Sequence, residues 1–378
     1  MPCQSLSALF GQGARVKILE ITNVDFSLRH FLLPLMRGMQ ARGHEVIGIS
    51  AEGPLLAIPR AEGFRIIAVP FVRSLSPLGN FRAFLALRRV MREQRPDLIH
   101  AHSPIAGFLA RLAAKSVGIP KIAYTCHGFI FNQRTSLPRR ALGFALEWLG
   151  GWITDIYLTV STEDAADARR LHIAHHAVAI GNGRDPTEFR PDPTARAQRR
   201  AQFGVRPDRV VVTIVSRLVR DKGYVELLAA MRHVNAELWV VGERLASDRG
   251  ENLDPIFATA PNLRRLGYRE DVAAILAASD IFVLPSYFEA LPMSVIEAML
   301  TGLPVVATNV RGPREQVIDG QTGLLVPLFD IPALTQALQS LATNPALRAT
   351  LGEAGRARAL DHYIEARVVT RTLDLLGL

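Results

Sequence analysis

The chain has 378 residues, of which 49% are hydrophobic and 21% are charged. That composition is typical of a folded protein, and the length is too great for one hydrophobic core, so we expect two domains. Its two cysteines exclude a small disulfide-stabilised scaffold and fit a reducing compartment. No stretch of about 18 uncharged apolar residues occurs, and the N-terminal sequence lacks the basic start of a signal peptide, so we expect no membrane-spanning helix and no secretion.

The net charge of +9 is concentrated in the first half of the chain. Residues 1–190 carry 23 basic and 14 acidic side chains, whereas residues 191–378 carry 21 of each. Within Arg60–Arg140 there are 14 basic and 3 acidic side chains. Such a field attracts a phosphate-bearing substrate, an acidic membrane surface or nucleic acid, although a solvated arginine-rich surface is the plain alternative. No recognised nucleic-acid-binding motif accompanies the charge, so we do not expect nucleic acid as a partner.

Short apolar runs alternate with helical patterns along the whole chain. This alternation is typical of parallel sheets covered by helices on both faces, so we predict an α/β fold of two doubly wound, Rossmann-like domains that face each other across a cleft. The predicted strands are Val16–Thr22, Val46–Ser50, Phe64–Val69, Leu98–His102, Lys121–Cys126, Ile156–Val160, Val210–Ser216, Glu237–Val241, Leu263–Leu266, Ile281–Pro285, Val305–Thr308 and Gly323–Val326. The predicted helices include Arg29–Arg42, Phe81–Arg95 and Ala106–Val117.

The domain limits follow from composition. Residues 1–14 are expected to be flexible, and residues 15–185 to form the first domain. The segment Asn182–Asp208 is rich in proline and charge, so we predict a linker at 186–208. The second domain is then expected at 209–358.

Several familiar motifs fail. The GNGRDP sequence at Gly181–Pro186 lacks the following helix of a dinucleotide fingerprint, and no Walker sequence occurs. No Asp-x-Asp is present, which argues against carboxylate-bound Mg²⁺ or Mn²⁺ on a nucleotide diphosphate. The cluster His172, His175 and His176 is typical of a helix-end surface group rather than a metal site. We therefore expect no metal and no cofactor.

The segment Val210–Met231 predicts an anion site. Its strand runs into a loop that carries Arg217 and Lys222, and Gly223 opens a helix. Two cations would then lie at the carboxyl end of a strand beside a helix N-terminus. Most basic residues in this chain are arginine, so a lysine here suggests a need for a compact point charge.

A second segment, YFEALPMSVIEAM at Tyr287–Met299, places Glu289 in a strand-to-helix loop and Glu297 one to two turns into a helix with Pro292 in its first turn. The backbone N–H groups at that helix start are free to meet an anion. The two carboxylates could hold hydroxyl groups, could act as an acid/base pair, or could be a cap and a surface charge.

Taken together, Ser216-Arg217-Leu218-x3-Lys222-Gly223 followed by Glu289-x7-Glu297 resembles the signature of the retaining glycosyltransferases of family 4, which have the GT-B fold. The resemblance spans roughly residues 15–375. Further pieces occur in the family's order, namely DLIHAHSP (Asp97–Pro104), YTCHGF (Tyr124–Phe129), TDIYLTVS (Thr154–Ser161), LGYREDV (Leu266–Val272) and DGQTGLLVP (Asp319–Pro327).

The resemblance implies roles for particular residues. Arg217 and Lys222 would neutralise the diphosphate of a nucleotide-sugar donor, Glu289 would accept hydroxyls of the transferred sugar, and Glu297 would accept the ribose hydroxyls. His127 would contact the sugar at the reacting centre and, with Arg217, Lys222 and Glu289, complete the expected catalytic set. The other expected donor-binding residues are Ser216, Gly267, Tyr268, Arg269, Ala290, Leu291, Met293 and Ser294, and the expected acceptor-side residues are Asn23, Asp25, His102 and His127. A C-terminal helix within 359–378 would return to the first domain.

The sequence also departs from the family pattern. The paired-glycine loop that many relatives have after the first strand, where it approaches acceptor and phosphate, is replaced by Asn23-Val24-Asp25-Phe26-Ser27. Ser216 stands where relatives usually have glycine, and the glycine pair after Val241 is reduced to Gly242-Glu243. No expected charged contact is lost.

The first half most resembles bacterial members that extend polyprenyl-diphosphate-linked sugars. We therefore expect transfer of a sugar, an N-acetylhexosamine being one candidate, from a UDP-linked donor to a lipid-linked glycan in capsule, exopolysaccharide or glycan assembly. The basic segment and the amphipathic Pro138–Trp152 would dock peripherally on the inner face of the cell membrane, unless Ala141–Thr154 is a core helix. The alternatives are the same fold with a soluble sugar acceptor, a sugar-nucleotide epimerase, and a non-catalytic sugar-nucleotide or nucleic-acid binder.

Overall fold

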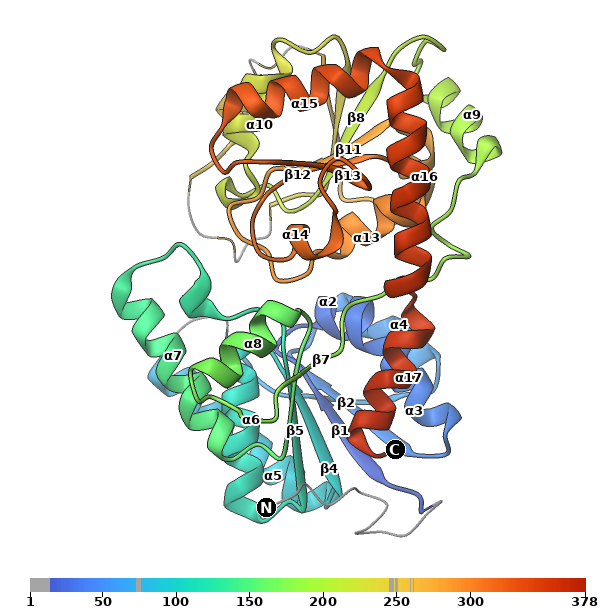
Figure 1. The fold of residues 1–378 in the computed structure, drawn as a ribbon. Coiled ribbons are helices and arrows are strands. Elements are labelled where there is room, and N and C mark those ends of the chain that lie inside the picture. Colours follow the sequence, from blue (N-terminus) through green and yellow to red (C-terminus); the bar gives the residue numbers. More distant parts are fainter. Residues whose placement is uncertain (1–13, 73–75, 245–247, 249–250, 259, 261) are drawn as a thin grey trace. The chain divides into compact units, whose positions relative to one another are not determined.

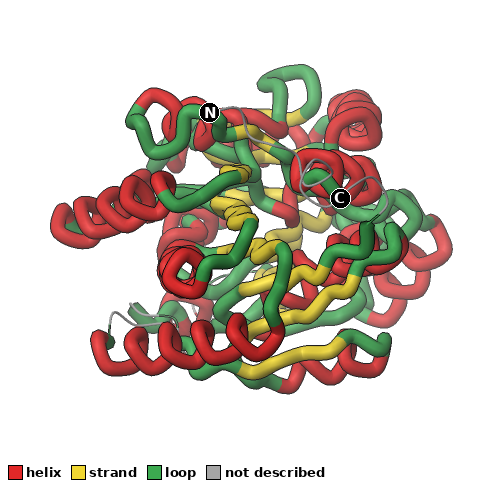
Figure 2. The backbone as a smooth tube through the Cα atoms, turned by 90° about the horizontal axis from the view of Figure 1, so that it is seen from below, coloured by secondary structure: helices red, strands yellow, loops and turns green. Residues whose placement is uncertain are grey.

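The computed structural model describes residues 14–378 except 73–75, 245–247, 249–250, 259 and 261 (Figure 1). The expectation of a flexible start at 1–14 falls, apart from residue 14, outside the described residues. The chain divides into two compact units, the first made of residues up to Gly181 together with Arg367–Leu378, and the second of Asn182–Ala366. Each unit contains one parallel sheet with helices around it. Figure 2 draws the strands in yellow and the helices in red. The predicted pair of Rossmann-like domains is confirmed.

The sheet of unit 1 has seven parallel strands in the order β3-β2-β1-β4-β5-β6-β7. The strand order reverses between β1 and β4, which makes their carboxyl ends the expected position for a ligand. The strands are β1 Lys17–Ile21, β2 Glu45–Ser50, β3 Arg65–Ala68, β4 Leu98–His102, β5 Lys121–Cys126, β6 Ile156–Thr159 and β7 Val178–Ala179. The short β7 was not predicted, because two residues carry no readable pattern.

Both faces of this sheet are covered. In β1, the side chains of Leu19 and Ile21 pack in a cluster with α5 and α6, whereas Ile18 packs in another with α3 and α17, as alternation along a strand requires. The helices of this unit are α2 Asp25–Ser27, a π-helix Leu28–Leu32, α3 Leu33–Ala41, α4 Ala57–Ala61, α5 Pro77–Gln94, α6 Pro104–Val117, α7 Leu137–Trp152, α8 Thr162–Arg170 and α17 Glu365–Leu376, with 3₁₀ turns at Pro54–Leu56 and Ile130–Asn132.

The sheet of unit 2 has six parallel strands in the order β10-β9-β8-β11-β12-β13, and its order reverses between β8 and β11. The strands are β8 Val211–Val215, β9 Glu237–Val241, β10 Leu263–Gly267, β11 Ile281–Leu284, β12 Val305–Thr308 and β13 Gly323–Val326. The helices are α9 Pro193–Gln202, α10 Tyr224–Met231, α11 Asp254–Ala258, α12 Val272–Ala278, α13 Met293–Leu300, α14 Pro313–Gln316, α15 Ile331–Thr343 and α16 Pro345–His362, with a 3₁₀ turn at Arg220–Lys222. Every predicted strand of both units is present with ends shifted by at most one residue.

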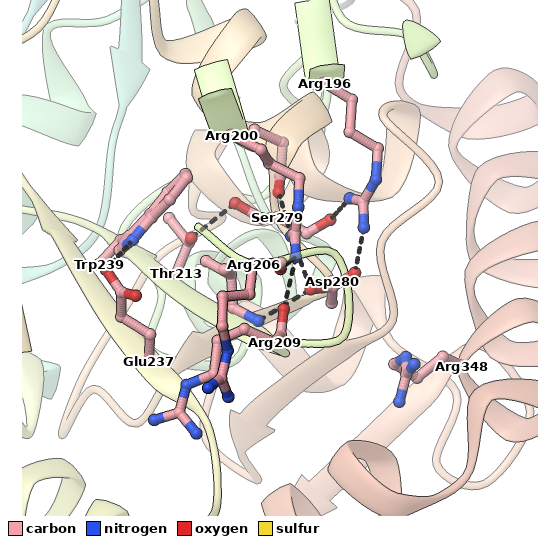
Figure 3. A network of polar contacts seen from close by, with 12 residues as sticks. Arg196, Arg200, Arg206, Arg209, Thr213, Glu237, Trp239, Ser279, Asp280 and Arg348 are labelled. Carbon is pink, nitrogen blue, oxygen red and sulfur yellow. Dashed lines mark hydrogen bonds and ion pairs between the residues drawn. The ribbon is translucent and has the colours of Figure 1, made fainter. Parts of the chain in front are cut away.

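Helix α9 lies inside the segment predicted as a linker. Arg196 donates to Asp280 Oδ1 at 2.5 Å, and Arg200 reaches the other carboxylate oxygen at 3.2 Å (Figure 3). Asp280 immediately precedes β11, so the two arginines anchor α9 to the amino ends of the central strands. The charge of this segment therefore serves a packed contact within unit 2, which composition alone cannot distinguish from solvated charge.

The C-terminal region forms two helices rather than one. Residues 359–362 end α16, and a separate α17 begins at Glu365. Leu373 and Leu376 of α17 are buried in the core of unit 1 together with Leu35 and Met39. Gly38 leaves room for this contact, because a Cβ there would lie 2.5 Å from Val369.

Candidate active site

Two loops of unit 2 meet at the carboxyl ends of β8 and β11, the adjacent strands between which the order reverses. The backbone N–H of Tyr287 donates to the carbonyl of Asp221 at 2.8 Å and ties the loops together. Gly223 adopts φ +76°, and a Cβ at this position would lie 2.0 Å from the carbonyl oxygen of Pro285. The close approach of the two loops therefore requires glycine here.

The locked loops bring Lys222 and Glu289 together. Lys222 Nζ lies 2.5 Å from Glu289 Oε1, and the Ser286 hydroxyl donates to the same oxygen at 2.7 Å. The lysine and glutamate side chains are only 18% and 11% exposed. Within the part of the chain that the structure describes, Glu289 Oε2 has no hydrogen-bonding partner. One oxygen is thus fixed by the protein, and the other can accept a hydroxyl group from a ligand.

Glu297 has the same arrangement on helix α13. Arg184 Nε donates to Glu297 Oε1 at 2.7 Å, and the two side chains are 15% and 9% exposed. Among the described residues nothing bonds to Glu297 Oε2. Asn182 Nδ2 donates to the carbonyl of Leu291 at 2.7 Å, so the segment before α9 supports both ends of this site. Sequence reasoning missed Asn182 and Arg184, because GNGRDP was tested only as a dinucleotide fingerprint.

The start of helix α13 differs by one residue from the prediction. Pro292 has φ −65° and ψ 126°, so it precedes the helix as the N-cap instead of forming its first turn, and Met293 is the first helical residue. No side chain caps this end. The first N–H groups of a helix have no acceptor within it, so those of Met293 and Ser294 can bind an anion. Leu291 is buried, and Ala290 is half-buried beside them.

Arg217 and Lys222 have different partners. The Arg217 side chain is 51% exposed and pairs with Asp248, while Lys222 pairs with Glu289. That both cations bind a diphosphate stays a prediction. Ser216 has its hydroxyl 2.9 Å from the Tyr224 hydroxyl.

The expected base-binding segment follows β10. Gly267 ends this strand with φ +68°, and Tyr268 is 42% exposed. Arg269 forms two hydrogen bonds with the carboxylate of Asp271, at 2.7 and 2.8 Å. Its guanidinium group is therefore held near the strand end, leaving Tyr268 as the exposed side chain of the segment.

Unit 1 carries a second polar cluster where β1, β4 and β5 end. Glu20 Oε1 lies 2.8 Å from His100 Nδ1, and Glu20 Oε2 lies 2.9 Å from His102 Nε2. His102 Nδ1 lies 3.0 Å from Nε2 of His127, and His100 Nε2 lies 2.8 Å from the Thr125 hydroxyl. Glu20, His100 and His102 are buried, whereas His127 is exposed. Sequence reasoning missed Glu20 and His100, although an isolated glutamate in an apolar strand is a signal that could have been noticed.

The protonation of this cluster follows from its surroundings. Burial raises the pKa of Glu20, but the charge of His100 and hydrogen bonds from His100 and His102 outweigh burial and lower that pKa to about 2. Burial, followed by repulsion from His100, lowers the pKa of His102 to about 4. Desolvation by the surrounding protein atoms, followed by repulsion from His102 and His100, lowers the pKa of His127, and the charge of Glu20 offsets part of that effect.

Glu20, His100 and His102 are also the described residues whose ligand atoms lie close enough to share a metal ion. One ring nitrogen of each histidine is instead paired with its own carboxylate oxygen at hydrogen-bonding distance. The nitrogen atoms therefore point at the carboxylate rather than at one common centre, so the arrangement fits a hydrogen-bonded cluster better than a metal site.

The remaining acceptor-side residues stabilise the loop after β1. Asn23 Oδ1 accepts from the Ser103 hydroxyl at 3.2 Å, and Ser103 adopts the unusual φ of +70° for a residue with a side chain. Asp25 accepts from the backbone N–H groups of Phe26 and Leu55 at 2.8 and 3.2 Å. The carboxylate of Asp25 thus links the loop after β1 to the backbone at Leu55.

Comparisons with known proteins identify the family and the fold of the chain. The sequence profile of Glycosyltransferase Family 4 matches residues 30–188, and that of Glycosyl transferases group 1 matches residues 195–358. Alpha-maltose-1-phosphate synthase of Mycobacterium tuberculosis is 32% identical over 308 residues, 74% of this chain and 78% of that protein. The UDP-Gal:alpha-D-GlcNAc-diphosphoundecaprenol alpha-1,3-galactosyltransferase of Escherichia coli is 28% identical over 291 residues, 73% and 74% of the two chains. The structure of Anabaena Alr3699/HepE in complex with UDP and glucose superimposes with a TM-score of 0.81 at 20% identity, over 96% of this chain and all of that one.

Two Rossmann-like units, each with one parallel sheet, give the chain the GT-B fold, and the sequence matches make it a glycosyltransferase. The chain belongs to glycosyltransferase family 4.

Proposed function

We propose that this protein transfers a sugar from a UDP-linked donor to a polyprenyl-diphosphate-linked glycan with retention of the anomeric configuration. The observation that carries the proposal is that two glutamates in unit 2 have the same hydrogen-bonding arrangement. Glu289 and Glu297 each have one carboxylate oxygen bound to a cationic side chain, while the other oxygen has no partner among the described residues. The uncapped start of α13 lies between them in the sequence, and Lys222 is the cation that binds Glu289. Hydroxyl acceptors on either side of an anion site fit a sugar, a diphosphate and a ribose.

The chemistry needs charge stabilisation more than a nucleophile. When the sugar–phosphate bond breaks, negative charge develops on the leaving diphosphate, where Lys222 and the amides of α13 can stabilise it. In the proposed front-face reaction, the acceptor oxygen bonds to the anomeric carbon on the face that the phosphate leaves. A departing phosphate oxygen takes the acceptor's proton, so neither glutamate has to form a bond to the sugar.

The choice of donor and acceptor is supported by relatives. The E. coli relative at 28% identity is named for UDP-Gal and for a diphosphoundecaprenol-linked acceptor, and other relatives are named for capsular polysaccharide and lipopolysaccharide core biosynthesis. The relative named for maltose-1-phosphate synthesis supports the rival with a soluble acceptor, so the experiment must separate the two.

Membrane docking, which is part of this proposal, is supported by the helix α7. Its buried residues are Gly143, Glu147, Gly150 and Gly151. Its exposed residues include Leu137, Leu149 and Trp152, which are 76%, 50% and 71% exposed. Phe144 and Trp148 of α7 pack against the core of unit 1, so the exposed Leu137, Leu149 and Trp152 are additional apolar side chains. Such a face fits an apolar surface outside the protein better than water.

The helix α5 continues this pattern with Leu78, Phe81 and Leu85, which are 73%, 58% and 44% exposed at positions that share a helix face. Nearby arginines on α5 and α7 would meet anionic lipid headgroups. No helix within the described residues is both long and apolar enough to cross a membrane, so the proposal is docking on the surface.

The first test measures nucleotide release from UDP-, GDP- and ADP-sugars, with and without membranes that contain polyprenyl-diphosphate-linked sugars. We expect release from a UDP-sugar that requires those membranes. Lys222→Ala should lower kcat by about 10²–10³-fold, whereas Lys115→Ala, a change at an exposed lysine in unit 1, should leave it unchanged. Release with soluble sugars alone would replace the lipid-linked acceptor by a soluble one, and no release from any donor would refute the transferase proposal.

A second test addresses docking alone. Flotation with vesicles of anionic lipid should recover the wild-type protein, and the double variant Leu149→Ser/Trp152→Ser should bind at least about tenfold more weakly. Ile318→Ser changes an apolar residue of unit 2 that is 38% exposed and should bind normally. Equal recovery of all three proteins would remove α7 from the docking surface.

A further inference from the structure

Each hydrogen bond of the polar cluster in unit 1 has a defined donor and a defined acceptor. Glu20 is fully buried and faces one ring nitrogen from His100 and one from His102. A carboxylate can only accept hydrogen bonds, and its low pKa of about 2 keeps it ionised at neutral pH. Both histidines must therefore donate to it, His100 through Nδ1 and His102 through Nε2.

The donor and the acceptor of the hydrogen bond between His102 and His127 follow from this. A neutral imidazole has one N–H group and one acceptor nitrogen, and the pKa of about 4 keeps His102 neutral at physiological pH. Because the proton of His102 is on Nε2, its Nδ1 can only accept. The partner of that Nδ1 is His127 Nε2 at 3.0 Å, which must donate.

The ring of His127 is left with one atom to present. Its Nδ1 has no hydrogen-bonding partner in the described part of the chain, and the residue is exposed. With Nε2 protonated, Nδ1 carries a lone pair and can accept a hydrogen bond from a hydroxyl group.

We propose that Glu20 and His102 are positioning residues that fix His127 in the tautomer protonated at Nε2, so that His127 Nδ1 accepts a hydrogen bond from a hydroxyl group of a sugar substrate bound at unit 1. The role at the sugar rests on the proposed function, whereas the tautomer itself does not. A carboxylate that sets the tautomer of a histidine is known from serine proteases. In this protein a second histidine lies between the carboxylate and the working ring.

The arrangement selects the kind of group that His127 can bind. The hydrogen bonds leave a lone pair on the outward Nδ1 of a neutral ring, and the negative charge of Glu20 lies behind the two rings. His127 therefore favours a hydroxyl group that donates a hydrogen bond.

The tautomer can be measured without any assay of transfer. In protein labelled with ¹⁵N-histidine, the two nitrogens of a neutral ring resonate far apart, and the His127 signals can be assigned from their loss in His127→Asn. At pH 7 we expect His127 and His102 to be protonated at Nε2. A His127 ring protonated at Nδ1, doubly protonated, or present as a mixture of tautomers would overturn the proposal. So would a stoichiometric metal ion in wild-type protein that is lost in Glu20→Gln.

Two substitutions at one position test the consequence for the reaction. The glutamine of His102→Gln can donate to Glu20 and accept from His127, so it preserves both hydrogen bonds with their donors and acceptors. His102→Leu removes both hydrogen bonds. We expect His102→Leu to lower kcat by about 10–100-fold with little change in KM for the donor, and to produce a mixture of His127 tautomers. His102→Gln should restore most of kcat and the Nε2-protonated signal.

Matched controls separate positioning from stability. Glu147→Gln changes another buried glutamate of unit 1, which binds Arg111, Tyr124 and Tyr157 and has no hydrogen bond to Glu20, His102 or His127. This variant should leave the His127 tautomer unchanged even if stability falls. Equal kcat in His102→Leu and His102→Gln would overturn the positioning role. If no nucleotide sugar turns over at all, the transferase proposal fails. The tautomer measurement still decides whether Glu20 and His102 fix the tautomer of His127.

Discussion

Glu20 and His102 illustrate how single buried residues can make a whole unit sensitive to acid. Both have pKa values below those of the free side chains, with Glu20 lowered from 4.5 to about 2 and His102 lowered from 6.5 to about 4. In each case the unfolded chain binds a proton at a higher pH than the folded chain does. The stability that these residues contribute is therefore present at neutral pH and is lost as the pH falls.

We predict that the free energy of unfolding of unit 1 falls between pH 6.5 and pH 4.5 through His102, and falls further below pH 4.5 through Glu20. A lowering of one pKa by about two units corresponds to roughly 3 kcal/mol. Urea unfolding across this range should show a shallower pH dependence between pH 6.5 and 4.5 for His102→Gln than for the wild type. Parallel curves for the two proteins would mean that His102 keeps an ordinary pKa.

The pair Arg184–Glu297 gives a prediction at the same scale. The carboxylate is 9% exposed and Arg184 is its described cationic partner, so Arg184→Met leaves a buried charge without compensation. We expect this variant to lose about 3 kcal/mol of stability, and Arg184→Met combined with Glu297→Gln to lose less than the sum of the single variants. Chemical unfolding of the four proteins gives the coupling energy. Strict additivity would show that the pair contributes nothing to stability.

At the scale of elements, the strands were predictable because continuous apolar runs indicate buried parallel strands. The site loops were predictable in part, since Glu289 and Glu297 fall on the loop and helix expected for them. What the sequence could not give is which cation meets which carboxylate. Arg184 lies 113 residues from Glu297, and only the fold brings them together. The exposed apolar face of α7 was likewise left open, because periodicity does not tell which side of a helix faces the core.

The contact between the two site loops yields a prediction for Gly223→Ala. The added Cβ meets both an unfavourable φ of +76° and the Pro285 carbonyl at 2.0 Å, so the Lys222 loop must move away from Glu289. We expect a loss of stability of about 2–3 kcal/mol and a fall in kcat for the donor reaction.

Gly204→Ala is a matched control for Gly223→Ala. Gly204 has a similar φ of +62°, but no atom lies within 4 Å of the position that its Cβ would occupy. This variant should lose only the backbone contribution to stability, about 1 kcal/mol, and it should keep its activity. If both variants behave alike in stability and turnover, the contact with Pro285 does not position Lys222.

At the scale of the whole molecule, the two units differ in how the chain forms them. Unit 2 is continuous, whereas unit 1 is completed by residues 367–378 only after the chain has passed through unit 2. Helix α17 supplies Leu373 and Leu376 to a core otherwise built from the first part of the chain. Residues 367–378 therefore contribute to the stability of unit 1. A destabilising substitution among them should affect the strands of unit 1, which lie far away in the sequence.

Leu376→Ala tests this connection. Leu376 is fully buried, and the loss of a buried leucine side chain typically costs 2–5 kcal/mol. We expect hydrogen exchange of backbone amides to accelerate in β1, β2 and β4 of unit 1, with protection retained in β8, β11 and β12 of unit 2. Leu341→Ala, which changes a fully buried residue of α15, should have the opposite effect. If either variant loosened both sheets to the same degree, the units would unfold as one cooperative body, and the C-terminal helix would stabilise the whole chain rather than the unit it completes.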